Sequence, residues 1–196
     1  MVNLKSIYFL FISFTFLLIA CEDEEKVLPR PIGQMRVEFP KHEYKQASIT
    51  ECGYSFEIPV SSEIMNGMNP NATCHKNIVY NDFNAVLYLS YYPLDTTSVN
   101  TLIKESRDKV YEHVVKASSI DEEMILDSSH HVYGIFYDIK GNAATPFQFF
   151  ITDSSKNFIR ASLMFNSVAN YDSLKPMIEY LKVDVDRMIQ TTEWSH

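Results

Sequence analysis

The chain has 196 residues, 46% of them hydrophobic and 21% charged, which is long enough for a sizeable core and typical of one globular domain. Its 17 Lys and Arg residues against 25 Asp and Glu residues give a formal net charge of −8 at pH 7. A nucleic-acid partner is therefore not expected, because phosphate backbones are bound by stripes of Lys and Arg, and the sequence contains no such stripe.

Residues 1–20 have the features of a secretory signal peptide. Lys5 precedes a largely apolar run over 7–19, which is too short for a membrane-spanning helix of about 20 residues but fits the apolar region of a signal peptide. The run closes on Leu18-Ile19-Ala20-Cys21, which resembles the bacterial lipobox, where the Cys thiol receives diacylglycerol before cleavage. We therefore expect lipid attachment at Cys21. An ordinary secreted protein is the alternative, but no Ala-x-Ala cleavage site lies nearby.

Residues 21–33 are predicted to form a flexible, lipid-anchored tether to a single globular domain over 34–196. The tether begins with the acidic run Glu22-Asp23-Glu24-Glu25, continues to Pro29 and Pro31, and has few large apolar side chains. It cannot bury enough surface to offset the entropy lost on ordering. Because the chain is acidic, acyl chains rather than attraction to anionic lipid would hold it at the membrane. The acidic run is either simply solvated or a sorting signal to the cell surface.

The cysteine count agrees with an oxidising compartment. Lipidation uses Cys21 and leaves Cys52 and Cys74 as an even pair, which we expect to form a disulfide outside the cytoplasm. A metal site built from Cys74, His75 and Cys52 is the alternative, but it lacks a second paired motif.

The first half of the domain is predicted to contain three strands followed by a helix. Apolar and polar residues alternate over 54–58, a segment that ends at Pro59. Two further strands are predicted over 77–80 and 85–92, separated by the turn signal Asn81-Asp82. A helix with one buried face follows, because apolar residues recur at helical spacing: Val99, Leu102, Ile103, Val110, Val114 and Ala117.

The second half repeats this arrangement. Strands are predicted over 132–139, 147–152 and 158–165. A closing helix is predicted from the apolar stripe Leu174, Met177, Ile178, Leu181, Val185, Met188 and Ile189. This order indicates an α+β fold with a mostly antiparallel sheet covered by helices. It also looks like the Mog1/PsbP-like sandwich, a likeness that sets no function because one fold hosts many roles.

The sequence contains none of the common catalytic or cofactor motifs, such as G-x-S-x-G, H-E-x-x-H or a phosphate-binding glycine loop. Adjacent His130 and His131 would point to opposite faces of a strand and would offer a metal one ligand at most. Three aspartates are acid–base candidates: Asp138, Asp153 and Asp172. Asp153 and Asp172, however, lie where turns and helix caps use Asp for backbone hydrogen bonds. We therefore expect no enzymatic activity, no cofactor and no metal.

Several short stretches resemble the GldD family of gliding motility lipoproteins from Bacteroidetes. One of them is Tyr133-Gly134-Ile135-Phe136-Tyr137, and their order and spacing together are more specific than any single stretch. The others lie at 35–40, 55–58, 111–113, 141–144, 148–154, 162–165 and 170–173.

The resemblance implies a non-enzymatic accessory component of the gliding motility machinery and of the associated type IX secretion system. Such a protein would be anchored in the cell envelope by lipid, would face the periplasm or the cell surface, and would contact other proteins of that machinery. The family supplies no catalytic residues. Two other functions stay open: a module that binds a small envelope ligand in an aromatic-lined groove, and a hydrolase with a non-standard site.

The turn Gly141-Asn142-Ala143-Ala144 is the candidate partner-contact loop. It is small and uncharged, and it joins two strands rich in aromatic residues. A hairpin needs Gly or Asn for positive φ but does not need two alanines. One interpretation is therefore that the loop is an exposed tip, which the backbone of another protein can approach closely. A turn chosen for its geometry alone is the other. The first interpretation predicts that Ala143→Glu leaves the fold intact and abolishes gliding.

Replacement of Cys21 by Ala is expected to abolish lipidation, because the thiol of the lipobox is the group that accepts diacylglycerol. Fatty-acid labelling of cells that express the Cys21→Ala chain measures this directly, with the wild-type chain as the control. Labelling that persists in the variant would contradict the assignment of Cys21.

Overall fold

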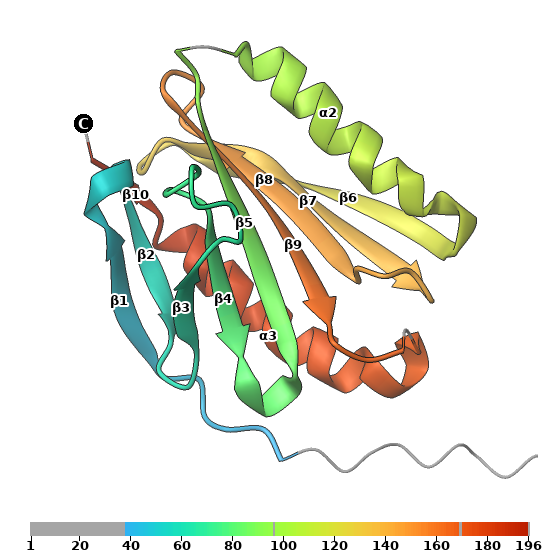
Figure 1. Cartoon of the computed structure of the whole chain (residues 1–196). Coiled ribbons are helices and arrows are strands. Elements are labelled where there is room, and N and C mark those ends of the chain that lie inside the picture. The colour runs from blue at the N-terminus through green and yellow to red at the C-terminus, as the bar shows by residue number, and fades with distance from the viewer. Residues whose placement is uncertain (1–37, 96, 169, 196) are drawn as a thin grey trace, which may run out of the picture. The chain divides into compact units, whose positions relative to one another are not determined.

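A computed structural model of the chain describes residues 38–95, 97–168 and 170–195 (Figure 1). None of the helices in these residues is both long and apolar enough to cross a membrane. In chain order the elements are β1 (Tyr44–Ile49), η1 (Thr50–Cys52), β2 (Tyr54–Pro59), β3 (Glu63–Asn66), β4 (Lys76–Tyr80), η2 (Asn81–Phe83), β5 (Ala85–Pro93), α2 (Val99–Tyr111), η3 (Glu112–Val115), β6 (Ala117–Asp127), β7 (Val132–Gly141), β8 (Phe147–Thr152), β9 (Asn157–Phe165), α3 (Tyr171–Gln190) and β10 (Glu193–Trp194).

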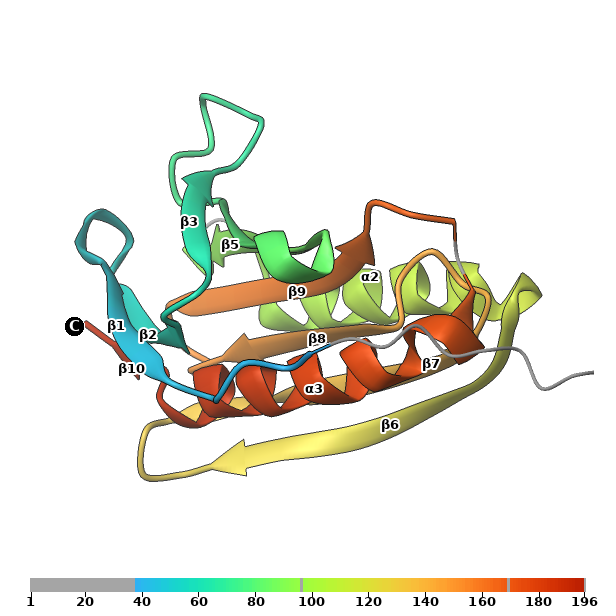
Figure 2. The ribbon, with the colours of Figure 1, turned by 90° about the horizontal axis from the view of Figure 1, so that it is seen from below.

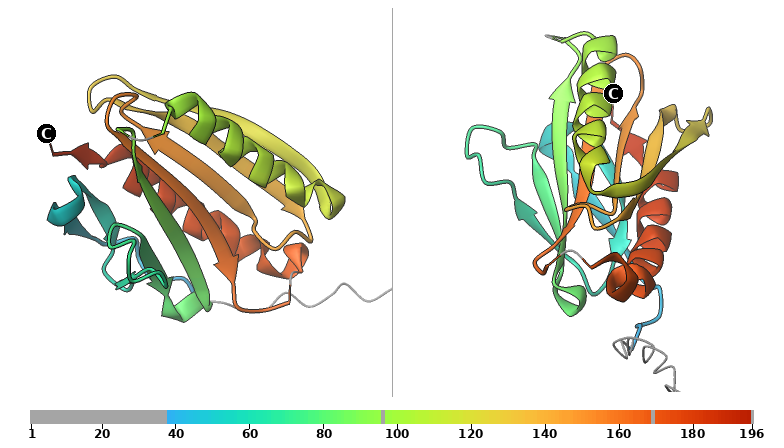
Figure 3. Two further views of the ribbon diagram at one scale, coloured as in Figure 1. Left: turned by 45° about the horizontal axis from the view of Figure 1, so that its top comes forward. Right: turned by 90° about the vertical axis from the view of Figure 1, so that its right-hand side faces the viewer.

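The described strands form two sheets. The large sheet is antiparallel throughout and has the order β3-β4-β5-β9-β8-β7-β6, and the small sheet has the order β1-β2-β10. Helices α2 and α3 lie on opposite faces of the large sheet (Figures 2 and 3), and α3 also contacts β2 of the small sheet. Strand β6 is therefore left at one edge of the large sheet, beside both helical layers.

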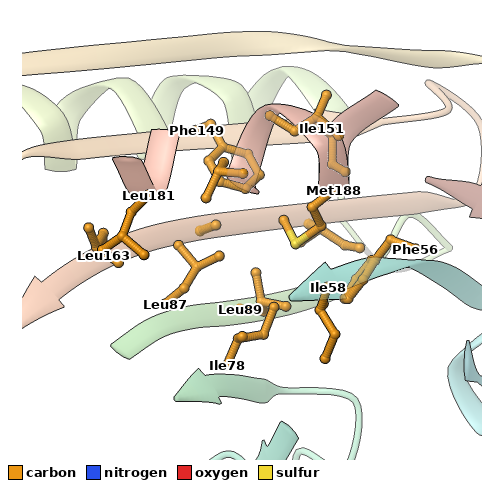
Figure 4. Packing of buried hydrophobic residues seen from close by; sticks show 14 of the residues in the cluster. Phe56, Ile58, Ile78, Leu87, Leu89, Phe149, Ile151, Leu163, Leu181 and Met188 are labelled. Atoms are coloured by element: carbon orange, nitrogen blue, oxygen red, sulfur yellow. The ribbon is translucent and has the colours of Figure 1, made fainter. Parts of the chain in front are cut away.

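Each face of the large sheet has its own hydrophobic cluster. Strand β8 is buried along its whole length because both of its faces are covered: Phe149 packs on the α3 side and Phe150 on the α2 side. On the α3 side, Leu181 and Met188 of the helix pack against apolar side chains from β2, β4, β5, β8 and β9 (Figure 4). The labelled strand residues there are Phe56, Ile58, Ile78, Leu87, Leu89, Phe149, Ile151 and Leu163.

The α+β class and the mostly antiparallel sheet expected from the sequence are confirmed. The six predicted strands correspond to β2, β4, β5, β7, β8 and β9, and the predicted closing helix is α3. The prediction that the first helix continues to Ala117 is wrong. Helix α2 ends at Tyr111 and β6 begins at Ala117, while the stripe residue Val114 between them is 55% exposed, so the buried face of the helix does not continue beyond Tyr111.

The predicted disulfide is present, joining Cys52 to Cys74 with a Cα–Cα distance of 5.6 Å. It connects η1, which follows β1, to the segment just before β4. The disulfide therefore joins the small sheet to the large sheet through two cysteines that are 22 residues apart in the sequence.

Removal of this disulfide by the double change Cys52→Ser and Cys74→Ser is expected to lower the free energy of unfolding by roughly 3 kcal/mol, because the closed loop no longer restricts the unfolded chain. Urea unfolding of the mature chain measures the loss. A reducing agent should produce the same loss in the wild-type protein and none in the double variant. Equal stability of the two proteins under oxidising conditions would contradict this prediction.

Candidate functional site

The residues singled out in the sequence lie in separate parts of the molecule. Cys21 lies outside the described residues, and Cys52 and Cys74 form the disulfide between η1 and the segment before β4. His130 and His131 lie in the turn between β6 and β7 rather than in a strand. In the described ranges, no group of three or more His, Cys, Asp or Glu side chains is arranged to hold a metal ion.

Within the 141–144 loop Ala143 is buried, which corrects the expectation that this residue lies at an exposed tip. Ala143 is only 7% exposed and belongs to the cluster on the α2 side. The side-chain oxygen of Asn142 accepts a hydrogen bond of 2.9 Å from the backbone N–H of Tyr171, at the start of α3. Asn142 and Ala144 are exposed, so contact of a partner with these two residues stays a prediction, but Ala143→Glu cannot test it.

Gly141 is required in this loop by the backbone. Its φ is +101°, and a Cβ there would lie 2.7 Å from the backbone N of Ser118 and 2.9 Å from the backbone O of Lys116. This close approach coincides with the irregularity in the β6–β7 pairing between Ala117 and Ser119. The glycine thus serves the geometry at the start of β6.

Strand β6, which the sequence pattern does not reveal, is an edge strand of the large sheet and lies beside a groove. Within the described residues it pairs with β7 alone, over the register from Ala117↔Gly141 to Asp127↔Val132. Its other side therefore presents a row of backbone N–H and C=O groups without strand partners, along the outer rim of the sheet (Figure 2).

Side chains of β6 alternate between the two helical sides. Ile125 packs with the cluster on the α3 side, and Glu123 and Asp127 share its face. Met124 and Leu126 project to the α2 side and are 74% and 71% exposed. The second half of β6 thus combines an open backbone edge with two exposed apolar side chains.

A groove of about 410 Å³ lies between β6 and α3. Phe136 of β7 and Ile189 of α3 provide its apolar surface, and Lys182, Asp186 and Gln190 of α3 line the side opposite β6. The buried stripe of α3 packs against the core, and this packing places the three polar residues at the rim of the groove. The groove is therefore an amphipathic channel beside the edge strand.

The charge balance of the groove is negative. Lys182 Nζ lies 2.9 Å from Asp138 Oδ2 and 3.2 Å from Glu179 Oε1. Burial lowers the pKa of Lys182, but the hydrogen bonds and ion pairs with Asp138 and Glu179 outweigh the effect of burial and raise the pKa overall. The ammonium group therefore stays protonated, and the two carboxylates balance its charge. Among the described residues, no ion pair joins Glu123 or Asp186 to a cation.

Asp127, at the end of β6, stays anionic as well. Hydrogen bonds from the side chains of Ser129 and His130 hold its pKa well below the usual range. Three carboxylates, from Glu123, Asp127 and Asp186, therefore line the groove. Such a site is suited to hold a cationic group and an extended backbone together.

Helix α3 also holds the segment through which the chain enters the domain. The Phe39 and His42 rings stack on Tyr180, with centroids 5.0 and 4.2 Å away, and His42 Nδ1 lies 2.7 Å from Asp184 Oδ1. Burial raises the pKa of Asp184, and the hydrogen bonds from His42 and Tyr44 offset only part of that effect. The perturbed carboxyl group thus belongs to a packed structural contact outside the groove.

Three comparisons with known proteins were made. A family model described as gliding motility lipoprotein GldD matches residues 24–194. No curated protein sequence matches the chain. Among solved structures, the solution structure of cyanobacterial PsbP (CyanoP) from Synechocystis sp. PCC 6803 matches with a TM-score of 0.46 and 12% sequence identity, covering 79% of this chain and 94% of that chain.

Replacement of Ala143 by Glu is expected to lower the free energy of unfolding by roughly 2 kcal/mol or more, because it places a charge in the α2-side cluster. Ala144→Glu is the matched control, because Ala144 is exposed and its replacement adds the same charge one residue away. Urea unfolding of the two variants measures the difference. Equal stability of both variants would contradict the burial of Ala143.

Proposed function

Because this chain belongs to the family of GldD gliding motility lipoproteins, we propose that it is a non-enzymatic accessory component of the gliding motility and type IX secretion machinery. Lipid on Cys21 anchors it in the cell envelope, and residues 21–33 hold the domain off the membrane on its periplasmic side. The domain acts by binding another protein of the machinery at the outer edge of β6.

The observation that carries this proposal is the open edge of β6. An edge strand of 11 residues whose outer side has no strand partner can pair with another chain, and proteins usually shorten or cover such edges. Here the strand is long, and its exposed Met124 and Leu126 lie beside the unpaired backbone. A bound protein would satisfy the backbone groups and would bury both side chains.

A small-ligand function in an aromatic-lined groove is less well supported. The groove beside β6 contains one aromatic residue, Phe136, and it opens along the strand edge. A hydrolase function has no better support. Lys182 is neutralised by two carboxylates, and Asp184, whose pKa is raised, lies in the contact with His42 and Tyr44.

Met124→Asp is expected to abolish gliding in a strain that lacks the chromosomal gene, because it places a charge in the surface that the partner covers. The fold should be retained, since Met124 is largely exposed. The matched control is Met68→Asp, since Met68 is 92% exposed and lies between β3 and β4, at the opposite edge of the large sheet from β6.

Spreading of colonies and secretion of reporter proteins measure the outcome, with protein abundance and urea unfolding recorded for both variants. The proposal predicts loss with Met124→Asp and normal motility with Met68→Asp. Normal gliding with a stably expressed Met124→Asp protein would remove the β6 edge from the proposed function.

A further inference from the structure

We propose that the outer edge of β6 receives an extended, basic segment of a partner protein as an added strand, with basic side chains in the groove beside α3 and apolar side chains over Met124 and Leu126. The inference rests on the proposed function, since it names the kind of partner that the same edge binds. Three features of the edge lead to it.

The first feature is the backbone. Strand β6 is held by β7 without interruption from Ser119 to Asp127, and β7 is held in turn by β8, whose side chains are buried throughout. The outer backbone groups of β6 are therefore fixed in space before a partner arrives. Main-chain hydrogen bonds to a preformed edge provide affinity with little ordering of the receptor.

The second feature is the groove on the α3 side. Side chains of an added strand alternate between the two sides, so every second one would point toward the groove. A Lys or Arg side chain there would lay its methylene groups on Phe136 and place its charge among Glu123, Asp127 and Asp186. Lys182 does not compete for these groups, because Asp138 and Glu179 hold it.

The third feature is the apolar surface on the α2 side. Leu126 is opposite Tyr133 and Met124 is opposite Ile135 across the β6–β7 pair, and both β7 residues are partly exposed. The remaining side chains of an added strand would extend this surface by one more strand. Valine, isoleucine or threonine suits that place, because β-branched residues pack well on a pleated surface.

Charge argues against two other occupants. A second copy of this chain would pair the acidic stretch Asp121-Glu122-Glu123 with another acidic β6, and like charges opposite each other destabilise strand pairs. The chain's own tether would bring the acidic run Glu22-Asp23-Glu24-Glu25 to the same groove. A basic segment of a different protein is the occupant that the charges favour.

Binding of synthetic peptides to the mature lipoprotein in detergent micelles tests the inference. The probe is Lys-Val-Lys-Val-Lys-Val-Lys, whose pattern reads the same in both chain directions. The first control has Glu in place of each Lys. Two further controls carry N-methyl groups on alternate amides, one on the Lys residues and one on the Val residues, so that together they remove both possible rows of hydrogen-bond donors.

The Lys peptide is expected to bind, with an affinity that falls as salt is raised, and the Glu peptide is expected not to bind. One of the two N-methylated peptides should bind at least about tenfold more weakly, because it loses several hydrogen bonds to the edge. Binding of both N-methylated peptides as tightly as the parent would overturn strand addition, and absence of binding by the Lys peptide would overturn the basic partner.

Variants of the protein locate the peptide. Glu123→Lys should weaken binding by about fivefold or more, and Glu105→Lys, the same change on the exposed side of α2, should leave it within about twofold. Equal weakening by both variants would overturn the location in the groove. A dimer of the free protein that Met124→Asp dissociates in sedimentation would also overturn the inference, because a second copy would then be the occupant.

Failure of this inference can be told apart from failure of the proposed function. If Met124→Asp abolishes gliding but the Lys peptide does not bind, the edge still functions and the partner is not basic. If the Lys peptide binds but Met124→Asp leaves gliding intact, the edge binds basic strands without a role in gliding.

Discussion

The packing of α3 against the large sheet is the interaction on which the other features depend. Its buried face, including Leu181, Val185 and Met188, closes the larger core and also contacts the small sheet. This packing also fixes the positions of the side chains on the other faces of α3. Asp184 and its neighbour Tyr180 hold the segment that enters the domain, and the polar residues at the rim form one wall of the groove beside β6. A shift of α3 would thus change the core, the contacts of Phe39 and His42, and the groove together.

The edge strand carries a physical conflict between stability of the monomer and readiness to bind. Acidic side chains such as Glu122 and Glu123 keep β6 soluble and resist pairing with acidic or identical strands. The same charges select a basic strand, while the exposed Met124 and Leu126 offer apolar contact area. One stretch of sequence can therefore protect the free protein and choose its partner.

Much of the fold could be predicted from the sequence because most strands have clear alternation and α3 has a continuous apolar stripe. The disulfide followed from the count of cysteines in an oxidising compartment. Strand β6 was missed because acidic residues, which are depleted in strands, fill its centre, and its pairing with β7 becomes visible only in three dimensions. The groove was out of reach for the same reason, since Glu123 and Asp186 are brought together by the fold. Ala143 was misjudged because alanine suits both a buried and an exposed position.

Hydrogen exchange of the β6 backbone in the cell envelope tests the central claim most directly. The account predicts that peptides covering 118–127 exchange more slowly in envelopes that contain the motility machinery than in the purified lipoprotein, because a partner strand then occupies the outer amides of β6. Peptides covering α2 should exchange equally in both samples. Equal exchange of the 118–127 peptides in envelope and purified protein would contradict the account.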